Sequence, residues 1–206
     1  MVLMVALITV ISVAAQQAKK RPLAASDIDA IVTLLMLEDS RKFDETELQR
    51  LSANPHPEVR RRAIQAIGRI PQRGGALLEA ARPDGDGEVA ATAVWAAGQL
   101  RDPGSTAWLA TTLGDTAAPQ TMGREAAIAL GKFRSPEAYA ALLQYLSSAP
   151  VGAPARVVGE ALLSIGRFPS GGDLAPIRRW TTSRDVEIRW RGAWARSRAS
   201  SSASSA

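Results

Sequence analysis

Very few side chains in this sequence could carry out catalysis or hold a metal ion. His56 is the only histidine, and the chain contains no cysteine. A zinc site built from histidine and cysteine is therefore excluded, and a Ser-His-Asp triad would have to use His56. His56 lies between Pro55 and Pro57, and a proline that follows a polar residue is typical of the first position of a helix. We therefore predict a structural role for His56.

The acidic turn Asp84-Gly-Asp-Gly-Glu88 is superficially similar to a calcium loop. It lacks the regularly spaced oxygen ligands and the distant glutamate that such a loop needs, so Asp86 is predicted to cap the following helix. No phosphate loop of the type Gly-x-x-x-x-Gly-Lys is present. We therefore predict no catalytic residue, no metal site and no cofactor, and a chain that is not itself an enzyme.

Most of the chain consists of altered copies of one segment, Glu58 to Ile70, with the sequence EVRRRAIQAIGRI. The later copies span residues 88–100, 121–133, 155–168 and 187–198. Corresponding residues in successive copies are 30 to 35 positions apart. A period in this range is the signature of a stacked repeat array.

Small residues recur at three positions of every copy. They are Ala63, Ala93, Ala126, Ala161 and Gly192; then Ala66, Ala96, Ala129, Ser164 and Ala195; then Gly68, Gly98, Gly131, Gly166 and Ser197. In the first copy, Val59, Ala63, Ala66, Ile67 and Ile70 fall at helical spacing on one face. Small residues on successive turns predict that another helix approaches this face closely.

A shorter apolar segment precedes each later copy, and Pro- or Gly-containing turns separate the segments. The shorter segments are residues 75–81, 105–113, 136–146 and 173–180. Each unit is therefore predicted to be a short helix A, a turn and the glycine-marked helix B. The predicted fold is an all-α solenoid, a superhelix of about five helix pairs.

The pattern from Pro55 to Ile70, Pro-x-Pro-Glu-Val-Arg-x-x-Ala-x-x-Ala-x-Gly-x-Ile, resembles bacterial HEAT repeats. Residues 31–70 also resemble the amino-terminal HEAT region of exported cyclophilin-type peptidyl-prolyl isomerases. The sequence has no segment that could form the isomerase domain itself. The resemblance implies a non-catalytic scaffold, or alternatively the repeat arm of such an isomerase.

The segment from Ala25 to Ser40 is predicted to be a helix that covers the N-terminal end of the solenoid. Ser26 is a candidate cap, and the predicted apolar side consists of Ile28, Ile31, Leu34, Leu35 and Met36. Solenoid ends need such covers. The alternative is a helix that binds a partner.

The first fifteen residues, MVLMVALITVISVAA, are apolar and carry no charge. They are shorter than the ~20 residues of a membrane-spanning helix and fit the apolar part of an export signal. One alternative is an uncleaved membrane anchor, which would be the only membrane contact expected of this chain. The other alternative is a cytoplasmic helix. The predicted location is exported, periplasmic or membrane-anchored, and cytoplasmic if residues 1–15 are not a signal.

The sequence predicts four segments of the chain. They are the leader at 1–15, a linker at 16–24, the solenoid at 25–198 and a disordered Ser/Ala tail at 199–206.

Two columns of side chains point away from the predicted packing face of helix B. An apolar column and a mostly basic column four residues later predict a groove for a protein or peptide. The candidate binding residues of the apolar column are Trp95, Ile128, Leu163 and Trp194. Those of the mostly basic column are Arg69, Gln99, Lys132, Arg167 and Arg198. The alternative is that the apolar column packs neighbouring helices together and the basic column is solvated.

The net charge of +5 arises in residues 120–206. Residues 120–206 contain 12 basic and 6 acidic side chains, whereas residues 16–119 contain 13 basic and 14 acidic ones. The basic part, Trp190 and Trp194 permit nucleic-acid binding. The acidic residues of the first part and the predicted export signal argue against it.

Overall fold

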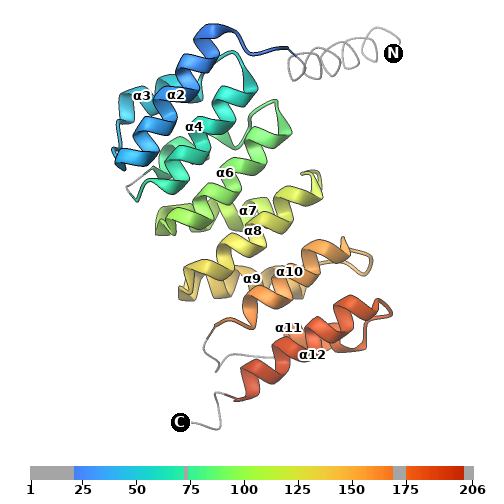
Figure 1. Cartoon of the computed structure of the whole chain (residues 1–206). Coiled ribbons are helices and arrows are strands. Elements are labelled where there is room, and N and C mark those ends of the chain that lie inside the picture. The colour runs from blue at the N-terminus through green and yellow to red at the C-terminus, as the bar shows by residue number, and fades with distance from the viewer. Residues whose placement is uncertain (1–20, 72–73, 169–174, 202–206) are drawn as a thin grey trace, which may run out of the picture. The chain divides into compact units, whose positions relative to one another are not determined.

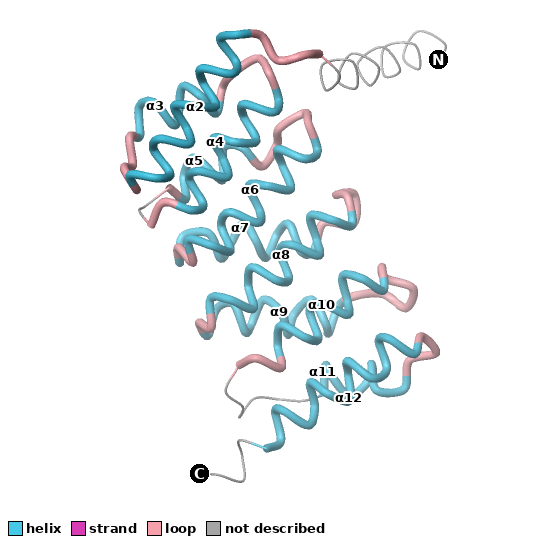
Figure 2. The backbone as a smooth tube through the Cα atoms, viewed as in Figure 1, coloured by secondary structure: helices cyan, strands magenta, loops and turns pink. Residues whose placement is uncertain are grey.

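The computed structural model describes residues 21–71, 74–168 and 175–201. Figure 1 shows the chain from end to end, and Figure 2 shows that every regular element in these ranges is a helix. The chain divides into two compact units, one up to Ala96 and one from Ala97, and each is described by itself.

Three predicted segments fall wholly or partly outside the described residues. The leader at 1–15 and the first part of the linker lie outside them, as do residues 202–206 of the predicted tail. Helix α12 (Val186–Ser201) continues through the first three residues of that tail. Among the helices that the structure describes, none is both long and apolar enough to cross a membrane.

The first unit contains two helix B segments and the helices that cover them. In chain order it comprises α2 (Ala25–Ser40), α3 (Glu45–Ser52), α4 (Pro57–Arg69), α5 (Gly75–Ala81) and the first part of α6 (Gly87–Leu100). Helix α4 packs against both α2 and α3 (Figure 1). The α4 residues Val59, Ala63, Ala66 and Ile67 are completely buried, which confirms the predicted packing face.

Helix α2 covers α4, but only part of its predicted apolar side is buried. Leu34 is buried as predicted, together with Ala30 and Leu37. Ile31 is half-buried, whereas Ile28, Leu35 and Met36 are 51%, 49% and 67% exposed. Apolar residues occur on both sides of this helix. Periodicity therefore does not select one face, and the contact with α4 decides which face is covered.

The start of α2 also differs from the prediction that Ser26 caps it. The helix begins at Ala25, and the carboxylate of Asp27 accepts hydrogen bonds from the Ala24 amide at 3.0 Å and from the Arg21 guanidinium at 3.2 Å. Asp27 is buried, so these two donors also satisfy a carboxylate that burial would otherwise destabilise.

The second unit continues the same alternation of helices. It comprises the rest of α6, η1 (Pro103–Ser105), α7 (Thr106–Gly114), α8 (Gln120–Phe133), α9 (Pro136–Ser148), α10 (Ala155–Ile165), α11 (Ala175–Arg178), η2 (Arg179–Thr182) and α12. Helix α10 packs against α8 and against α12, so the helix B segments follow one another in sequence order (Figure 1). Helix α9 packs against α7 and α11 in the same way. The predicted all-α solenoid of helix pairs is confirmed.

The glycine of helix B is the point of closest approach between successive helix B segments. A Cβ atom added to this glycine would lie less than 3.0 Å from a Cβ of the following helix, which real side chains do not tolerate. From the added Cβ to the Cβ of the neighbour, the distance is 2.6 Å for Gly68 and Ala96, 2.8 Å for Gly98 and Ala129, and 2.6 Å for Gly131 and Ser164. The recurring small residues therefore set the spacing of the stack.

Three helices end at an arginine whose backbone is left-handed, a conformation in which glycine is usual. They are Arg41 after α2, Arg101 after α6 and Arg134 after α8, with φ of 51°, 53° and 54°. Each places a positive charge beside the negative end of a helix dipole, which is favourable. The ends of α6 and α8 therefore carry more positive charge than the repeat pattern alone predicts.

Candidate functional site

His56 is buried, and both ring nitrogens are engaged. Its Nδ1 accepts a hydrogen bond from the Glu58 amide at 3.1 Å, and its Nε2 lies 2.9 Å from the carbonyl oxygen of Arg21. The neutral tautomer with hydrogen on Nε2 satisfies both contacts. His56 thus caps α4 and attaches the segment before α2 to it, as expected for a structural histidine.

The acidic turn at residues 84–88 caps one helix and binds another. The carboxylate of Asp86 accepts from the amides of Glu88 and Val89 at 2.9 and 3.3 Å, so it caps α6 as predicted. The carboxylate of Asp84 receives two hydrogen bonds of 2.8 Å from the Arg60 guanidinium on α4. Within the described residues, no group of three or more potential ligand side chains is arranged to hold a metal ion.

We expect the ion pair between Arg60 and Asp84 to make the first unit sensitive to acid. Burial raises the pKa of Asp84, but hydrogen bonds from Arg60 and the Asp86 amide outweigh burial, so the pKa lies below its usual 3.8. Because the folded pKa is depressed, the stabilisation is present above pH 3.8 and is lost as the pH falls through the folded pKa. Asp84→Asn should cost about 1.5–3 kcal/mol at pH 7, measured by urea unfolding, and much less at pH 2.

A matched control is Asp29→Asn, since Asp29 is exposed on α2. This variant should keep the pH dependence of the wild-type chain. An Asp84→Asn variant that loses stability equally at pH 7 and pH 2 would show that the charge of Asp84 is not what stabilises the turn.

The predicted basic column lies at the carboxyl ends of the helix B segments, where it is mainly solvent-accessible. Arg69, Gln99, Arg167 and Arg198 are exposed, and Lys132 is half-buried. Arg69 does not have a free charge, because its guanidinium lies 2.9 Å from the carboxylate of Glu38 on α2. The first member of the column is thus neutralised inside the first unit.

The strongest concentration of positive charge in this column surrounds Lys132. Burial lowers the pKa of the Lys132 amine, and the nearby positive charges of Arg101 and Arg167 lower it further, against the opposing effect of Glu125. Arg101 lies just after α6 and is not a member of the predicted column. Three positive groups therefore gather at the ends of α6, α8 and α10 within the second unit.

The apolar column is half-buried throughout, and the structure assigns part of it to packing. Trp95, Ile128, Leu163 and Trp194 are all partly accessible. Trp194 covers Gly166, since a Cβ on that glycine would lie 2.4 Å from Cζ3 of the indole. The column therefore combines the two predicted alternatives, because it packs helices and still presents an apolar surface.

The two tryptophans of α12 behave differently. Trp190 is 46% exposed and its indole nitrogen donates to Glu187 at 3.0 Å on the same helix. Trp194 is half-buried against α10. Trp190 is therefore the more accessible of the two.

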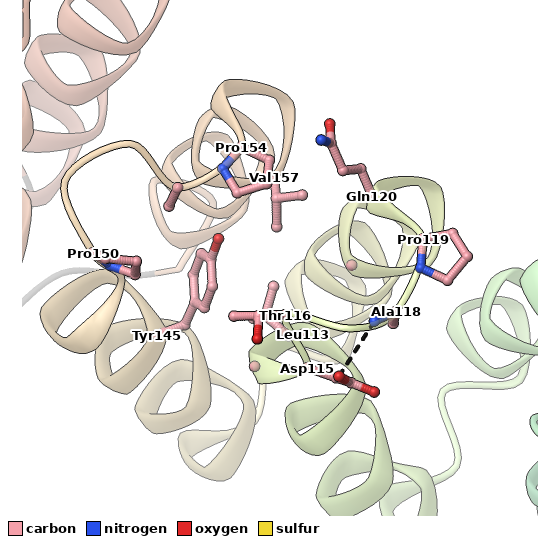
Figure 3. A pocket seen from close by; sticks show the side chains of 13 residues that line it. Leu113, Asp115, Thr116, Ala118, Pro119, Gln120, Tyr145, Pro150, Pro154 and Val157 are labelled. Carbon is pink, nitrogen blue, oxygen red and sulfur yellow. Dashed lines mark hydrogen bonds between the residues drawn. The ribbon is translucent and has the colours of Figure 1, made fainter. Parts of the chain in front are cut away.

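The second unit also contains a cavity that the repeat pattern does not predict. It has a volume of about 330 Å³ and lies at the turns that connect helix A to helix B. Figure 3 shows Leu113, Tyr145 and Val157 beside this space and Pro119 and Pro154 at its edges. Burial raises the pKa of the Tyr145 hydroxyl, which keeps it protonated. The lining is otherwise mainly apolar.

Two further cavities adjoin this one. A cleft of about 560 Å³ shares Pro119 and Gln120 with it, and a cavity of about 690 Å³ shares Ala153 with it. The cleft is lined by charged residues of α8, α10 and α12, namely Arg124, Arg156, Glu160 and Arg191. Pro119, Pro150 and Pro154 line the first cavity, and prolines between apolar segments indicate turns without indicating a cavity.

Comparisons with known proteins agree with this fold. Residues 74–163 match the family model described as HEAT repeats. The crystal structure of an engineered protein from a structural genomics consortium is similar, with 19% sequence identity and a TM-score of 0.52. The alignment covers 91% of this chain and 97% of that one. No curated protein matches the chain.

These comparisons bear on the architecture of the chain. The structural neighbour is too distant in sequence to indicate more than the fold. The repeat pattern, the order of the packed helices and the family match agree with one another. Within the described residues, the chain is an all-α solenoid of helix pairs in which α2 covers α4, and residues 74–163 are similar to HEAT repeats.

Proposed function

We propose that this chain is a non-catalytic scaffold that binds an acidic, partly apolar segment of a protein partner along helix B in the second unit. HEAT repeats form helical scaffolds that often bind proteins. The observation that carries the proposal is the group Arg101, Lys132 and Arg167 beside the half-buried Ile128 and Leu163.

The chemistry of this surface favours an anionic ligand over a neutral one. Burial lowers the pKa of Lys132, Glu125 opposes this, and the like charges of Arg101 and Arg167 lower the pKa further, so an incoming carboxylate would offset their repulsion. Apolar side chains of the ligand would cover the accessible parts of Ile128 and Leu163. Interfaces commonly combine such an apolar centre with a charged rim.

Charge reversal at this surface is expected to abolish most of the binding. Peptides selected from a random displayed library on the immobilised chain should be rich in acidic and apolar residues. The double variant Lys132→Glu and Arg167→Glu should weaken the selected peptides by about tenfold or more, because an attraction becomes a repulsion. Fluorescence polarisation with the labelled peptides measures this change.

The control carries the same change in net charge at another place. Arg178→Glu with Arg184→Glu reverses two exposed arginines that are not among the charges acting on Lys132. The selected peptides should bind this control as they bind the wild type. Equal losses in both double variants would mean that only net charge matters, and the proposal would then be abandoned.

A further inference from the structure

The edge of the second unit where helix A turns into helix B contains an apolar cavity joined to an arginine-lined cleft. Both include residues of α8, of α10 and of the turn before α8, and they share Pro119 and Gln120. The cavity also includes residues of α7, α9 and the turn before α10, and the cleft includes Arg191 of α12. This edge lies at the amino ends of the helix B segments. It is therefore separate from Lys132 and Arg167, which lie near the carboxyl ends.

The cleft carries an excess of positive charge among the residues that line it. Arg124 and Arg191 share one carboxylate oxygen of Glu160, at 3.3 and 3.9 Å. The Nε of Arg191 is buried without a hydrogen-bond partner, although it lies 3.5 Å from Glu187. Arg156 is exposed at the mouth of the cleft, and none of the described residues forms an ion pair with it. Arg124 also pairs with Glu125 at 3.1 Å, so Arg156 is the one lining arginine that has no ion pair with the other described residues.

The starts of α8 and α10 add hydrogen-bond donors to the same place. Both helices follow a proline, Pro119 and Pro154, and neither has a side-chain cap. By contrast, His56, Asp86 and Asp185 cap α4, α6 and α12. The first amides of a helix are able to bond a carbonyl or carboxylate of a ligand.

The size of the apolar cavity limits what it could hold. About 330 Å³ lies at the low end of the range for ligand sites. That volume suits one or two aliphatic side chains better than a long acyl chain. Leu113, Val157 and the prolines provide an apolar wall, and the Tyr145 hydroxyl provides one polar contact.

We propose that this edge is a second binding site, which takes a peptide segment with an aliphatic side chain next to acidic residues. The aliphatic side chain occupies the cavity beside Tyr145 and Val157. The neighbouring carboxylates lie in the cleft and pair with Arg156 and the shared arginines. This inference rests on the proposed scaffold function and assigns it a second contact surface.

The test is a titration of the isotope-labelled full chain with defined peptides, followed by amide chemical shifts. The probe is acetyl-Gly-Leu-Glu-Glu-Gly-amide, and the comparison peptides replace Leu with Ser or both Glu with Lys. The probe should shift the amides of Gln120, Thr121 and Gly123. Each comparison peptide should bind at least about tenfold more weakly, because one of the two contacts is lost.

Variants separate this site from the helix B surface. Arg156→Glu reverses a charge that has no ion pair with the other described residues, and Ala118→Leu fills the cavity from a partly exposed turn position. Each should weaken the probe about tenfold. Arg178→Glu, which changes an exposed arginine outside both surfaces, should leave its affinity unchanged.

Each other outcome overturns the inference in a recognisable way. Shifts confined to Ile128 and Lys132 would reject the edge site and support the helix B surface. Equal binding of the Glu and Lys peptides would reject the contact between the acidic residues and the arginines. If Ala118→Leu is folded by its spectrum and binds the probe as the wild type does, the aliphatic side chain does not occupy the cavity. Absence of any shift at millimolar peptide would reject the edge site, while peptides selected on Lys132 and Arg167 would still report on the proposed function.

Discussion

Replacing Trp180 with alanine is expected to lower the free energy of unfolding of the second unit by about 3–5 kcal/mol. Trp180 is only 7% exposed, and its indole nitrogen donates to the carbonyl oxygen of Leu146 at 3.0 Å. Truncation would leave both a cavity and a buried carbonyl without its partner. Urea unfolding followed by circular dichroism measures the loss.

The contact matters because α9 cannot satisfy its own last turn. The residue four positions after Leu146 is Pro150, which has no amide hydrogen to donate to the Leu146 carbonyl. Arg179 completes the cap, since its guanidinium donates to the carbonyl of Ser147 at 2.7 Å and to that of Ala149. The following helix A thus caps the preceding one.

Two other variants identify the cause of the loss. Trp180→Phe keeps most of the packing but leaves the Leu146 carbonyl unpaired, which should cost about 1–3 kcal/mol. Trp190→Ala removes an indole that is 46% exposed and should change stability by about 0.5 kcal/mol or less. Similar losses at Trp180 and Trp190 would contradict the structure of this end of the chain.

The fold was predictable because the residues that determine it are local and repeated. Ala63, Ala66 and Gly68 recur with one spacing, and a helix puts all three on a single packing surface. The predicted segment 75–81 coincides with α5, and the predicted segment 105–113 differs from α7 by one residue at each end. Periodicity failed at α2, where apolar residues on two sides left the buried face undetermined.

Contacts between distant residues were not predictable from one sequence. The cap on α9 joins Trp180 to Leu146 across 34 positions, and nothing in the local pattern of either residue indicates the other. The left-handed arginines had no glycine to mark them. Such features depend on how one pair of helices packs on the next.

The candidate binding surface was predictable in position but not in charge. Helical spacing placed Ile128, Lys132 and Leu163 at partly accessible positions, as expected. The neutralisation of Arg69 by Glu38 and the approach of Arg101 to Lys132 depend on tertiary packing. The cavity beside Tyr145 depends on the path of two turns, which residue types do not encode.

Gly131→Ala is expected to destabilise the second unit by about 1–3 kcal/mol. The added methyl group would lie 2.6 Å from Cβ and Oγ of Ser164 and 3.1 Å from its Cα. A flexible side-chain end could move away, but a Cα moves only if α10 moves as a whole. The midpoint of urea unfolding should therefore fall, although alanine favours the helix more than glycine does.

The same substitution in the same helix gives the opposite expectation at Gly123. There the added Cβ would lie 3.4 Å from Val157, an ordinary contact, so only the gain in helix preference of up to about 1 kcal/mol remains. Opposite signs for Gly131→Ala and Gly123→Ala would show that close contact of α8 with α10, and not helix propensity, requires glycine at position 131. If both variants were stabilised alike, successive helix B segments would not touch at their glycines, and the explanation of the repeat spacing would be wrong.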